Sequence, residues 1–334
     1  MTISFHHHFR NGDHIINNVL DKLAEMGFKN LTLAASSLSA VHAPLIEHIR
    51  SGLITHIETS GLRGELAEQI SRGLMDFPVV FRSHGGRASA IRSGELHIDV
   101  AFLGAPSCDP YGNANGYSRD DDDGISCGSL GYARTDAEFA DKVIIITNNI
   151  VSYPNAPWAI PEHDVDYVVR VDDIGDPKGI MSGATRYTKD PKELLIAKTA
   201  ANVVEAAGYL YDGFSMQMGS GGASLATARF IRQKMLDKGI RCRFALGGIT
   251  GQITAMHEEG LIDRVLDVQS FDLDAAKSLK NNHFHHQISA TYYASHLVAT
   301  AAEQLDFVIL SALEIDTDFN VNVLTGSDLS LIHI

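Results

Sequence analysis

Short apolar runs alternate with amphipathic stretches along most of the chain. The apolar runs are continuous for five to seven residues, which indicates strands buried on both faces. The predicted strands cover residues 31–35, 53–57, 98–104, 142–147, 214–218, 242–246 and 307–312. The predicted helices cover residues 43–51, 65–75, 192–208 and 225–238. This alternation predicts an α/β fold in which helices cover a parallel sheet.

An internal repeat relates the two halves of the chain. Residues 99–116 align without gaps with residues 306–323, at an offset of 207. The alignment pairs Asp99 with Asp306, Asp109 with Asp316, Asn113 with Asn320, and Asn115 with Asn322. A weaker block at an offset of 187 pairs Gly52, Gly61 and Gly64 with Gly239, Gly248 and Gly251. The 20-residue difference between the offsets predicts an insertion in the second copy, at about residues 278–289.

The repeat predicts two tandem α/β domains, at residues 1–185 and 186–328, with the boundary in the Gly-, Pro- and charge-rich stretch 173–190. A chain of 334 residues is long enough for two domains. Ligands of open α/β sheets bind at the carboxyl ends of strands, so we expect the loops after the strands of both copies to share a cleft. The last six residues, LSLIHI, resemble translated adapter DNA. We therefore expect residues 329–334 to be a non-native tail and the second domain to be incomplete.

Composition excludes several classes of protein. The chain has 27 Lys and Arg against 41 Asp and Glu, a net charge of −14, and no basic block. Nucleic-acid binding depends on neutralising phosphates, so this composition argues against it. No apolar run reaches the length of a membrane span. The three cysteines, Cys108, Cys127 and Cys242, suit a reducing compartment. We therefore expect a cytoplasmic protein that binds neither nucleic acid nor membrane.

A glycine-rich loop at 219–224 stands between a predicted strand and a predicted helix. In such a loop the backbone N–H groups of Gly219, Ser220, Gly221 and Gly222 can approach an anion closely. The alternative is a purely structural turn. No acidic residue ends the next predicted strand, which argues against a dinucleotide site.

A second candidate lies just before the strand at 98–104. Arg82, His84, Arg87 and Arg92 surround a Gly-Gly pair, and arginines of this kind suit bidentate recognition of carboxylates. The alternative is a connecting loop with surface arginines. Histidines cluster at 6–8 and 283–286, but no nearby Cys, Asp or Glu completes a metal site at the usual spacing. We expect no bound metal.

Acidic residues follow the last predicted strand. Glu314 comes two residues after this strand, and Asp316 lies beyond it. Acidic groups at strand ends are candidates for catalysis or hydrogen bonding. The Asp-x-x-x-Asn-x-Asn pattern present in both copies also has a structural explanation, a turn in which Asp and Asn side chains cap their own backbone.

Four strings together resemble the citrate lyase alpha chain family: FHHHFR at 5–10, GAPSCDPYGNANG at 104–116, MGSGGA at 218–223 and LEIDTDFNVNV at 313–323. The resemblance runs from Thr2 to about Ser327. It implies two tandem coenzyme-A-transferase-like (NagB/RpiA-like) α/β domains, in agreement with the repeat. It also implies an acyl transferase that exchanges acetate for citrate on the thioester of an acyl carrier protein.

The resemblance further implies partners. These are a beta chain, which cleaves the citryl thioester, and a gamma chain, the acyl carrier protein, within an oligomer. No cofactor is expected on this chain itself, because a phosphopantetheine-type prosthetic group would be carried by the gamma chain. The alternatives are an acyl-CoA hydrolase or acetate CoA-transferase of the same fold, and a non-catalytic carboxylate-binding module.

One departure from related enzymes bears on mechanism. Many coenzyme A transferases carry a nucleophilic Glu in the turn that matches residues 245–251, and Leu246 stands in its place. A leucine cannot form an acyl-enzyme, which favours direct attack by a citrate carboxylate in a ternary complex. We expect backbone N–H donors at Gly221, Gly222 and Gly248, and citrate carboxylates at Arg82, Arg87 and Arg92. Glu314 is a candidate for binding the pantetheine arm or for a covalent route.

Overall fold

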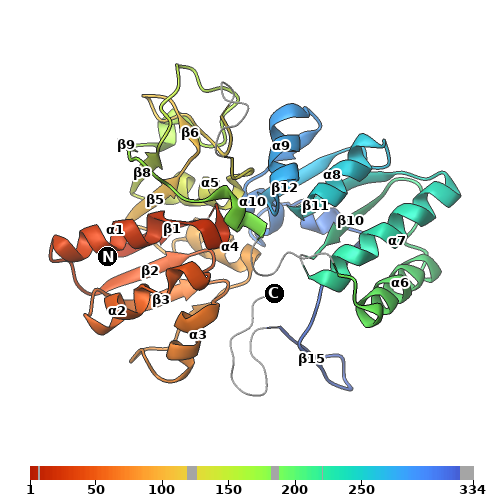
Figure 1. Cartoon of the computed structure of the whole chain (residues 1–334), viewed down its shortest axis with the longest axis horizontal. Helices are drawn as coiled ribbons and strands as arrows, with labels where there is room; N and C mark the ends of the chain where they lie inside the picture. The colour runs from red at the N-terminus through yellow and green to blue at the C-terminus, as the bar shows by residue number, and fades with distance from the viewer. Residues whose placement is uncertain (7, 119–125, 182–187, 220, 324–334) are drawn as a thin grey trace.

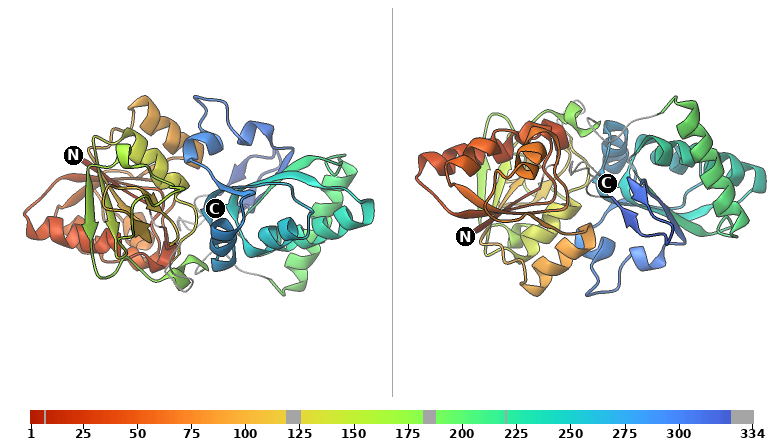
Figure 2. Two further views of the ribbon diagram at one scale, coloured as in Figure 1. Left: turned by 90° about the horizontal axis from the view of Figure 1, so that it is seen from above. Right: turned by 90° about the horizontal axis from the view of Figure 1, so that it is seen from below.

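Two parallel sheets organise the chain, one in each half (Figure 1). The computed structural model describes residues 1–6, 8–118, 126–181, 188–219 and 221–323. The predicted boundary at residue 185 and the predicted tail at 329–334 lie outside these residues. The two halves lie side by side, as the views in Figure 2 show.

The first sheet has the strand order β4-β3-β2-β1-β5-β8-β9, and all its pairings are parallel. Its strands are β1 (Thr2–Phe5), β2 (Leu31–Ala35), β3 (Ile54–Thr59), β4 (Val80–Phe81), β5 (Val100–Gly104), β8 (Lys142–Thr147) and β9 (Tyr167–Arg170). Its helices are α1 (Ile15–Glu25), α2 (Leu45–Arg50), α3 (Gly64–Ser71), α4 (His84–Ser93) and α5 (Gly131–Phe139). The small hairpin β6 (Ser107–Cys108) and β7 (Ala114–Asn115) follows β5.

The second sheet has the strand order β13-β12-β11-β10-β14, again with parallel pairings. Its strands are β10 (Phe214–Met218), β11 (Cys242–Ile249), β12 (Val265–Ser270), β13 (His285–Gln287) and β14 (Phe307–Ile309). Its helices are α6 (Pro191–Ala206), α7 (Gly222–Lys238), α8 (Gly251–Glu258), α9 (Leu273–Asn281) and α10 (Ala290–Ala294). The hairpin β15 (Glu314–Ile315) and β16 (Val321–Asn322) follows β14. The fold is therefore α/β with parallel sheets, as the sequence predicts.

The two sheets share a strand order. Numbered within its own half, each runs 4-3-2-1-5, and the first sheet adds two strands beyond the fifth. The hairpins correspond residue by residue at the offset of 207, since 107–108 and 114–115 match 314–315 and 321–322. In both hairpins an Asp carboxylate accepts backbone N–H groups and the side-chain amide of the Asn four residues later, Asp109 from Asn113 and Asp316 from Asn320. The capping explanation of this pattern is therefore confirmed.

The weaker alignment at an offset of 187 is wrong. It pairs Gly61 with Gly248, and so β3 with β11, but in the shared strand order β11 is the counterpart of β2, and the counterpart of β3 is β12. Both glycine segments lie where a strand gives way to a helix, so they share local chemistry without sharing a place in the sheet. The insertion predicted at 278–289 is also wrong, because these residues contain β13, the counterpart of β4 in the strand order.

Each half has its own hydrophobic core. One cluster of buried residues lies within residues 3–180 and another within residues 201–275. A third cluster joins the halves and includes Ala88 and Tyr132 from the first half and Phe244, Leu246 and Tyr293 from the second. No helix among the described residues is long and apolar enough to cross a membrane. The three cysteines are buried and unpaired.

Helix α6 begins one residue before the predicted start at 192. The Asp190 carboxylate accepts the N–H of Lys192, and Pro191 occupies the first helical position. The apolar positions that revealed the helix do not face the core, because Leu195 and Val203 are 65% and 60% exposed. Ala197, Ala201 and Val204 supply its buried face instead.

Candidate functional site

A cavity of about 200 Å³ lies where the carboxyl ends of both sheets meet. Four strands of each sheet, β1 to β4 and β10, β11, β12 and β14, place a residue at or within five positions of their carboxyl end on the cavity wall. The first half contributes Arg10, Ser36, Ser37, Ser39, Ser60, Arg63, Ser83, His84 and Tyr132. The second half contributes Gln217, Met218, Gly219, Gly248, Val268, Gln269, Phe271, Tyr293 and Leu310. The shared cleft expected from the repeat is present.

Hydrogen-bond donors dominate the polar part of the wall. None of the described lining residues is Asp or Glu. Four buried polar atoms on the wall have no hydrogen-bond partner among the described residues: Ser60 Oγ, Arg63 Nη2, His84 Nδ1 and Gln269 Nε2. Leaving such groups unpaired costs free energy. The arrangement therefore suits a ligand that is rich in acceptor oxygens and negatively charged.

Arg10 is held firmly in this wall. Its backbone adopts a left-handed conformation, with φ of 55°, and its Nη1 donates to the carbonyl of Ile180 at 3.1 Å. The guanidinium lies over the ring of Phe271, with 4.7 Å from Cζ to the ring centroid. Burial, followed by the charge of Arg63, lowers the pKa of Arg10 to about 10. Arg10 stays cationic at neutral pH.

Arg63 is the second cation of the cavity. It occupies the position before the first residue of α3, so the amino end of that helix adds positive potential. Burial lowers the pKa of Arg63 to about 10. The two guanidinium charges repel one another, and an anion bound between them would offset that repulsion.

His84 is the first residue of α4, and the hydroxyl of Ser83 caps that helix by accepting the N–H of Gly86. Burial, followed by the charge of Arg87, lowers the pKa of His84 to about 4. The imidazole is therefore neutral near pH 7 and can donate from one ring nitrogen only. Its ring lies against Tyr132, with ring centroids 5.2 Å apart.

The second half supplies the apolar and tightly packed part of the wall. Gln217 donates to the hydroxyl of Tyr293 at 2.8 Å. At Gly248 a Cβ atom would lie 2.1 Å from the ring of Phe271, so only glycine allows that ring to lie where it stacks on Arg10. Met218, Val268 and Leu310 complete this side.

Three predicted site residues line the cavity and three predicted arginines do not. His84, Gly219 and Gly248 lie on its wall. Arg82 instead forms ion pairs with Glu58 and Glu95. Arg87 is buried in a bidentate pair with Asp136, at 2.6 and 2.8 Å. Arg92 is exposed and lies over the ring of Phe139.

The loop at 219–224, predicted to bind an anion, lies only partly on the cavity wall. Gly221 precedes α7 and Gly222 begins it, and neither lines the cavity, whereas Gly219 does. Ser220 lies outside the described residues. The Glu193 carboxylate lies against Gly222, since a Cβ atom there would be 2.5 Å from its Oε2. Glu314 is on the exposed hairpin, where it accepts from Asn322 at 2.9 Å, and it is not a cavity residue.

Sequence reasoning missed Arg10, Arg63, Ser60 and Gln269. Each lies at or a few residues after the carboxyl end of a strand, β1, β3 or β12. The rule that ligands bind at these ends therefore contained the signal. The grouping of arginines at 82–92 in the sequence favoured that segment instead.

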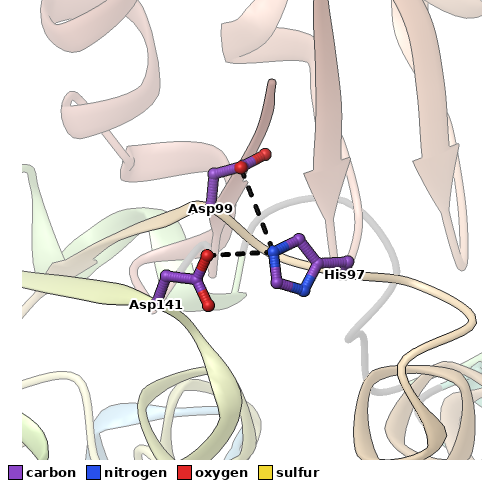
Figure 3. A group of neighbouring side chains, drawn as sticks. All are labelled: His97, Asp99 and Asp141. Carbon is purple, nitrogen blue, oxygen red and sulfur yellow. Dashed lines mark hydrogen bonds and ion pairs between the residues drawn. The ribbon is translucent and has the colours of Figure 1, made fainter.

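A group formed by His97, Asp99 and Asp141 lies at the amino ends of β5 and β8, at the end of the first sheet away from the cavity (Figure 3). His97 Nε2 is 3.0 Å from Asp141 and 4.0 Å from Asp99. Asp99 and Asp141 directly precede β5 and β8, and Asp99 accepts the N–H of Thr2 at 2.6 Å. Asp306, its repeat counterpart, accepts the N–H of Ser215 at 2.7 Å. The aspartates thus tie strand starts together, away from the cavity.

The fold is that of coenzyme-A-transferase-like proteins. The structure aligns with the malonate decarboxylase alpha subunit of Acinetobacter baumannii at a TM-score of 0.69 and 16% identity, covering 99% of this chain and 61% of that chain. It aligns with a 4-hydroxybutyrate CoA-transferase of Porphyromonas gingivalis at a TM-score of 0.53 and 16% identity, covering 87% and 64%.

Within this class the chain belongs to the citrate lyase alpha subunit family, whose model matches residues 1–332. It is 59% identical to the citrate lyase alpha chain of Haemophilus influenzae and 57% identical to that of Escherichia coli, over 98% of this chain. A crystal structure of the Streptococcus mutans alpha subunit of citrate lyase in complex with citrate aligns at a TM-score of 0.94 and 56% identity, covering all of this chain. The chain spans 64–65% of the length of these relatives.

Proposed function

We propose that the cavity binds citrate and that the protein exchanges acetate for citrate on the thioester of an acyl carrier protein. The observation that carries this proposal is the set of unpaired donors at Ser60, Arg63, His84 and Gln269 around a cavity without lining acids. Citrate, with three carboxylates and a hydroxyl, supplies acceptors for several donors at once. A solved relative is in complex with citrate, which supports the same ligand here.

The proposed reaction needs no covalent enzyme intermediate. A citrate carboxylate oxygen attacks the carbonyl of the acetyl thioester, a C–O bond forms, and the C–S bond breaks to release the carrier thiolate. The thiolate then attacks the citryl carbonyl of the mixed anhydride and acetate leaves. Leu246 stands where related enzymes carry a nucleophilic Glu, which is consistent with this route. Glu314 belongs to the exposed hairpin and is not needed for it.

The chain's own contribution is then positioning and charge stabilisation. Arg10 and Arg63 hold carboxylates, and neutral His84 donates a hydrogen bond from one ring nitrogen. The backbone N–H of Gly248 is the proposed donor to the oxyanion, whereas Gly221 and Gly222, which the sequence also predicted for this role, lie outside the cavity wall. An oxyanion donor is typically worth about 3–4 kcal/mol.

We further propose that the chain acts in a complex with a beta chain, which cleaves the citryl thioester, and a gamma chain. The gamma chain carries the phosphopantetheine-type group, so this chain binds none of its own. The apolar side of the cavity, formed by Met218, Val268 and Leu310, suits the uncharged arm and acetyl group of such a thioester. A cytoplasmic location stays a prediction.

Citrate binding tests the proposal directly. We expect Arg63→Gln to weaken calorimetrically measured citrate binding by about 10-fold or more, because a hydrogen bond to a charged group contributes about 1.5–3 kcal/mol. Arg92→Gln is the matched control and should leave binding unchanged, since Arg92 lies outside the cavity. Equal citrate affinity in wild type and Arg63→Gln would contradict the site.

Transfer itself requires a second experiment. The protein is mixed with acetyl carrier protein and labelled citrate, and the thioester and free acid fractions are separated. We expect citryl thioester and acetate in equal amounts. Release of acetate with no citryl thioester would indicate a hydrolase of the same fold instead.

A further inference from the structure

The hydroxyl of Tyr293 uses only part of its hydrogen-bonding capacity within the protein. Tyr293 lines the cavity and is 8% exposed. Its oxygen accepts a hydrogen bond from the side-chain amide of Gln217, with 2.8 Å between Nε2 and Oη. Among the described residues this is the one hydrogen bond that the hydroxyl makes. A tyrosine hydroxyl is also a donor, so its proton is available to a ligand in the cavity.

This hydroxyl keeps its proton at neutral pH. Burial raises the pKa of Tyr293, and the hydrogen bond from Gln217 lowers it by less. The hydrogen bond that the oxygen accepts also polarises the O–H and strengthens it as a donor. Tyr293 is therefore a neutral donor in a site with little water, which is the environment where a hydrogen bond to developing negative charge is strongest.

Two glycines of β11 make room for this arrangement. A Cβ atom on Gly247 would lie 2.7 Å from Cδ of Gln217, and a Cβ atom on Gly248 would lie 2.1 Å from the ring of Phe271. Gly247 also has a φ of 98°, a left-handed conformation that favours glycine. The amide of Gln217 thus lies directly against Gly247. The hydroxyl of Tyr293 is one side-chain amide away from the backbone of this Gly-Gly pair.

Helix α10, which carries Tyr293, is held in place by the first half. The N–H of Thr291 donates to Thr135 Oγ1 at 3.2 Å, and the hydroxyl oxygens of Ser295 and Ser89 are 3.0 Å apart. The helix packs against α4 and α5, and Tyr293 belongs to the cluster of buried residues that joins the halves. A donor fixed in this way needs no reorganisation when charge develops beside it.

We propose that Tyr293 is a catalytic residue of the transfer. Its O–H and the backbone N–H of Gly248 donate together to the oxyanion that forms on the thioester carbonyl, and Gln217 positions the hydroxyl. This inference rests on the proposed function. When a citrate carboxylate oxygen bonds to the carbonyl carbon, the π electron pair moves to the carbonyl oxygen, which accepts both hydrogen bonds. When the C–S bond breaks, that pair re-forms the carbonyl and the thiolate leaves. The proton of Tyr293 stays on its own oxygen throughout.

The place of Tyr293 favours the thioester carbonyl over citrate. Three of the four unpartnered donors of the cavity wall come from the first half, and these are the groups that we assign to carboxylates. Tyr293 lies with Gln217 and Gly248 in the second half, on the same side of the cavity as Met218 and Leu310. Loss of the Tyr293 hydroxyl should therefore reduce turnover and leave citrate affinity unchanged.

Tyr293→Phe tests this role in the transfer assay with acetyl carrier protein and citrate. We expect kcat to fall by about 100-fold, because removal of one oxyanion donor typically costs that much or more. Citrate affinity, measured by calorimetry, should equal that of wild type, which also shows that the variant is folded. Tyr292→Phe is the matched control on the same helix, since Tyr292 is 43% exposed and outside the cavity wall. It should change neither quantity.

The results that would overturn the inference differ from those that would overturn the proposed function. Wild-type kcat in Tyr293→Phe would overturn the inference. A loss of citrate affinity as large as the loss of kcat would also overturn it, because the hydroxyl would then bind citrate. If wild type itself makes no citryl thioester, the proposed function fails and the inference fails with it.

A measurement without turnover checks the contact directly. Acetyl carrier protein labelled with carbon-13 at the acetyl carbonyl is bound in the absence of citrate, and the carbonyl stretch is recorded by infrared difference spectroscopy. A donor to the carbonyl oxygen weakens the C=O bond, so the stretch should lie at lower wavenumber in wild type and Tyr292→Phe than in Tyr293→Phe. The same wavenumber in all three proteins would overturn the proposal.

Gln217→Glu tests the positioning role of Gln217. A carboxylate at this position accepts the O–H of Tyr293 and so withdraws the proton from the cavity, while the tyrosine ring and the size of the side chain are kept. We expect kcat to fall about as far as in Tyr293→Phe, by about 100-fold, and the carbonyl stretch to move to the same wavenumber. Wild-type kcat with an unshifted stretch would contradict the assignment of Gln217.

Discussion

Arg87 and Arg63 are two enclosed arginines with opposite surroundings. Arg87 is 2% exposed and its guanidinium is matched by the Asp136 carboxylate and the carbonyl of Ala34. Arg63 has a buried Nη2 without a partner among the described residues. The paired Arg87 stabilises the fold, whereas the unpartnered Arg63 Nη2 lowers the free energy of unfolding until a ligand binds to it.

Arg87→Ala should therefore act on stability. Removing one partner of a buried ion pair leaves an uncompensated charge on Asp136, and we expect a loss of about 3–5 kcal/mol in the free energy of unfolding, measured in urea. Arg92→Ala, on the same helix but exposed, should change it by less than about 0.5 kcal/mol. A stable Arg87→Ala protein with weakened citrate binding would instead return Arg87 to the site.

His8 should make stability depend on pH. Burial lowers the pKa of His8 from 6.5 to about 3, and neither ring nitrogen has a partner among the described residues. The unfolded chain therefore binds more protons between pH 6.5 and pH 3, so stability falls as pH falls through this window. We expect His8→Phe to remove about 3 kcal/mol of that loss, measured by urea unfolding at pH 7 and pH 4. If wild type and variant lose the same free energy of unfolding between pH 7 and pH 4, His8 is not the source of the pH dependence.

At the scale of elements, the repeat provides a matched pair of turns. Asp109 is fully buried and accepts from the backbone of Tyr111, Gly112, Asn113 and Asn155. Asp316 makes the corresponding turn at an exposed site.

Asp109→Ala should consequently lower the free energy of unfolding by about 3 kcal/mol or more, because several buried donors lose their acceptor. Asp316→Ala should cost less than about 1 kcal/mol, since water replaces the carboxylate. Thermal or urea unfolding of the two variants measures the difference. Similar losses for both variants would show that burial does not determine how much this turn contributes to the free energy of unfolding.

The elements that sequence predicted best are the central strands. Lys142–Thr147 and Phe214–Met218 have the bounds predicted, because strands buried on both faces leave a continuous apolar run. The edge strands β4 and β13 were not predicted, since one has two residues and the other reads His-His-Gln. The positions of these two strands are set by pairing with a neighbouring strand, and their own short sequences contain no signal of that pairing. The cavity residues Arg10 and Arg63 were missed for a related reason, because strands distant in sequence bring them together.

At the scale of the whole molecule, the cavity joins both halves, so a ligand bound there should stabilise the protein. At 100 times its dissociation constant citrate should contribute about 2.7 kcal/mol, measured as a rise in melting temperature. The rise should shrink in Arg63→Gln at the same citrate concentration. An equal rise with acetate at that concentration would contradict a site built for several carboxylates.

The shared 4-3-2-1-5 strand order gives the cavity two walls of common design but different chemistry. One wall carries the arginines, serines and histidine, and the other carries two glutamines beside glycine, aromatic and aliphatic groups. A duplicated scaffold thus lets each wall change without disturbing the other. For the proposed reaction, substitutions that alter which acid is recognised should accumulate in the first half, and those that alter which thioester is accepted should accumulate in the second. Selectivity for each of the two proposed substrates could then evolve independently of the other.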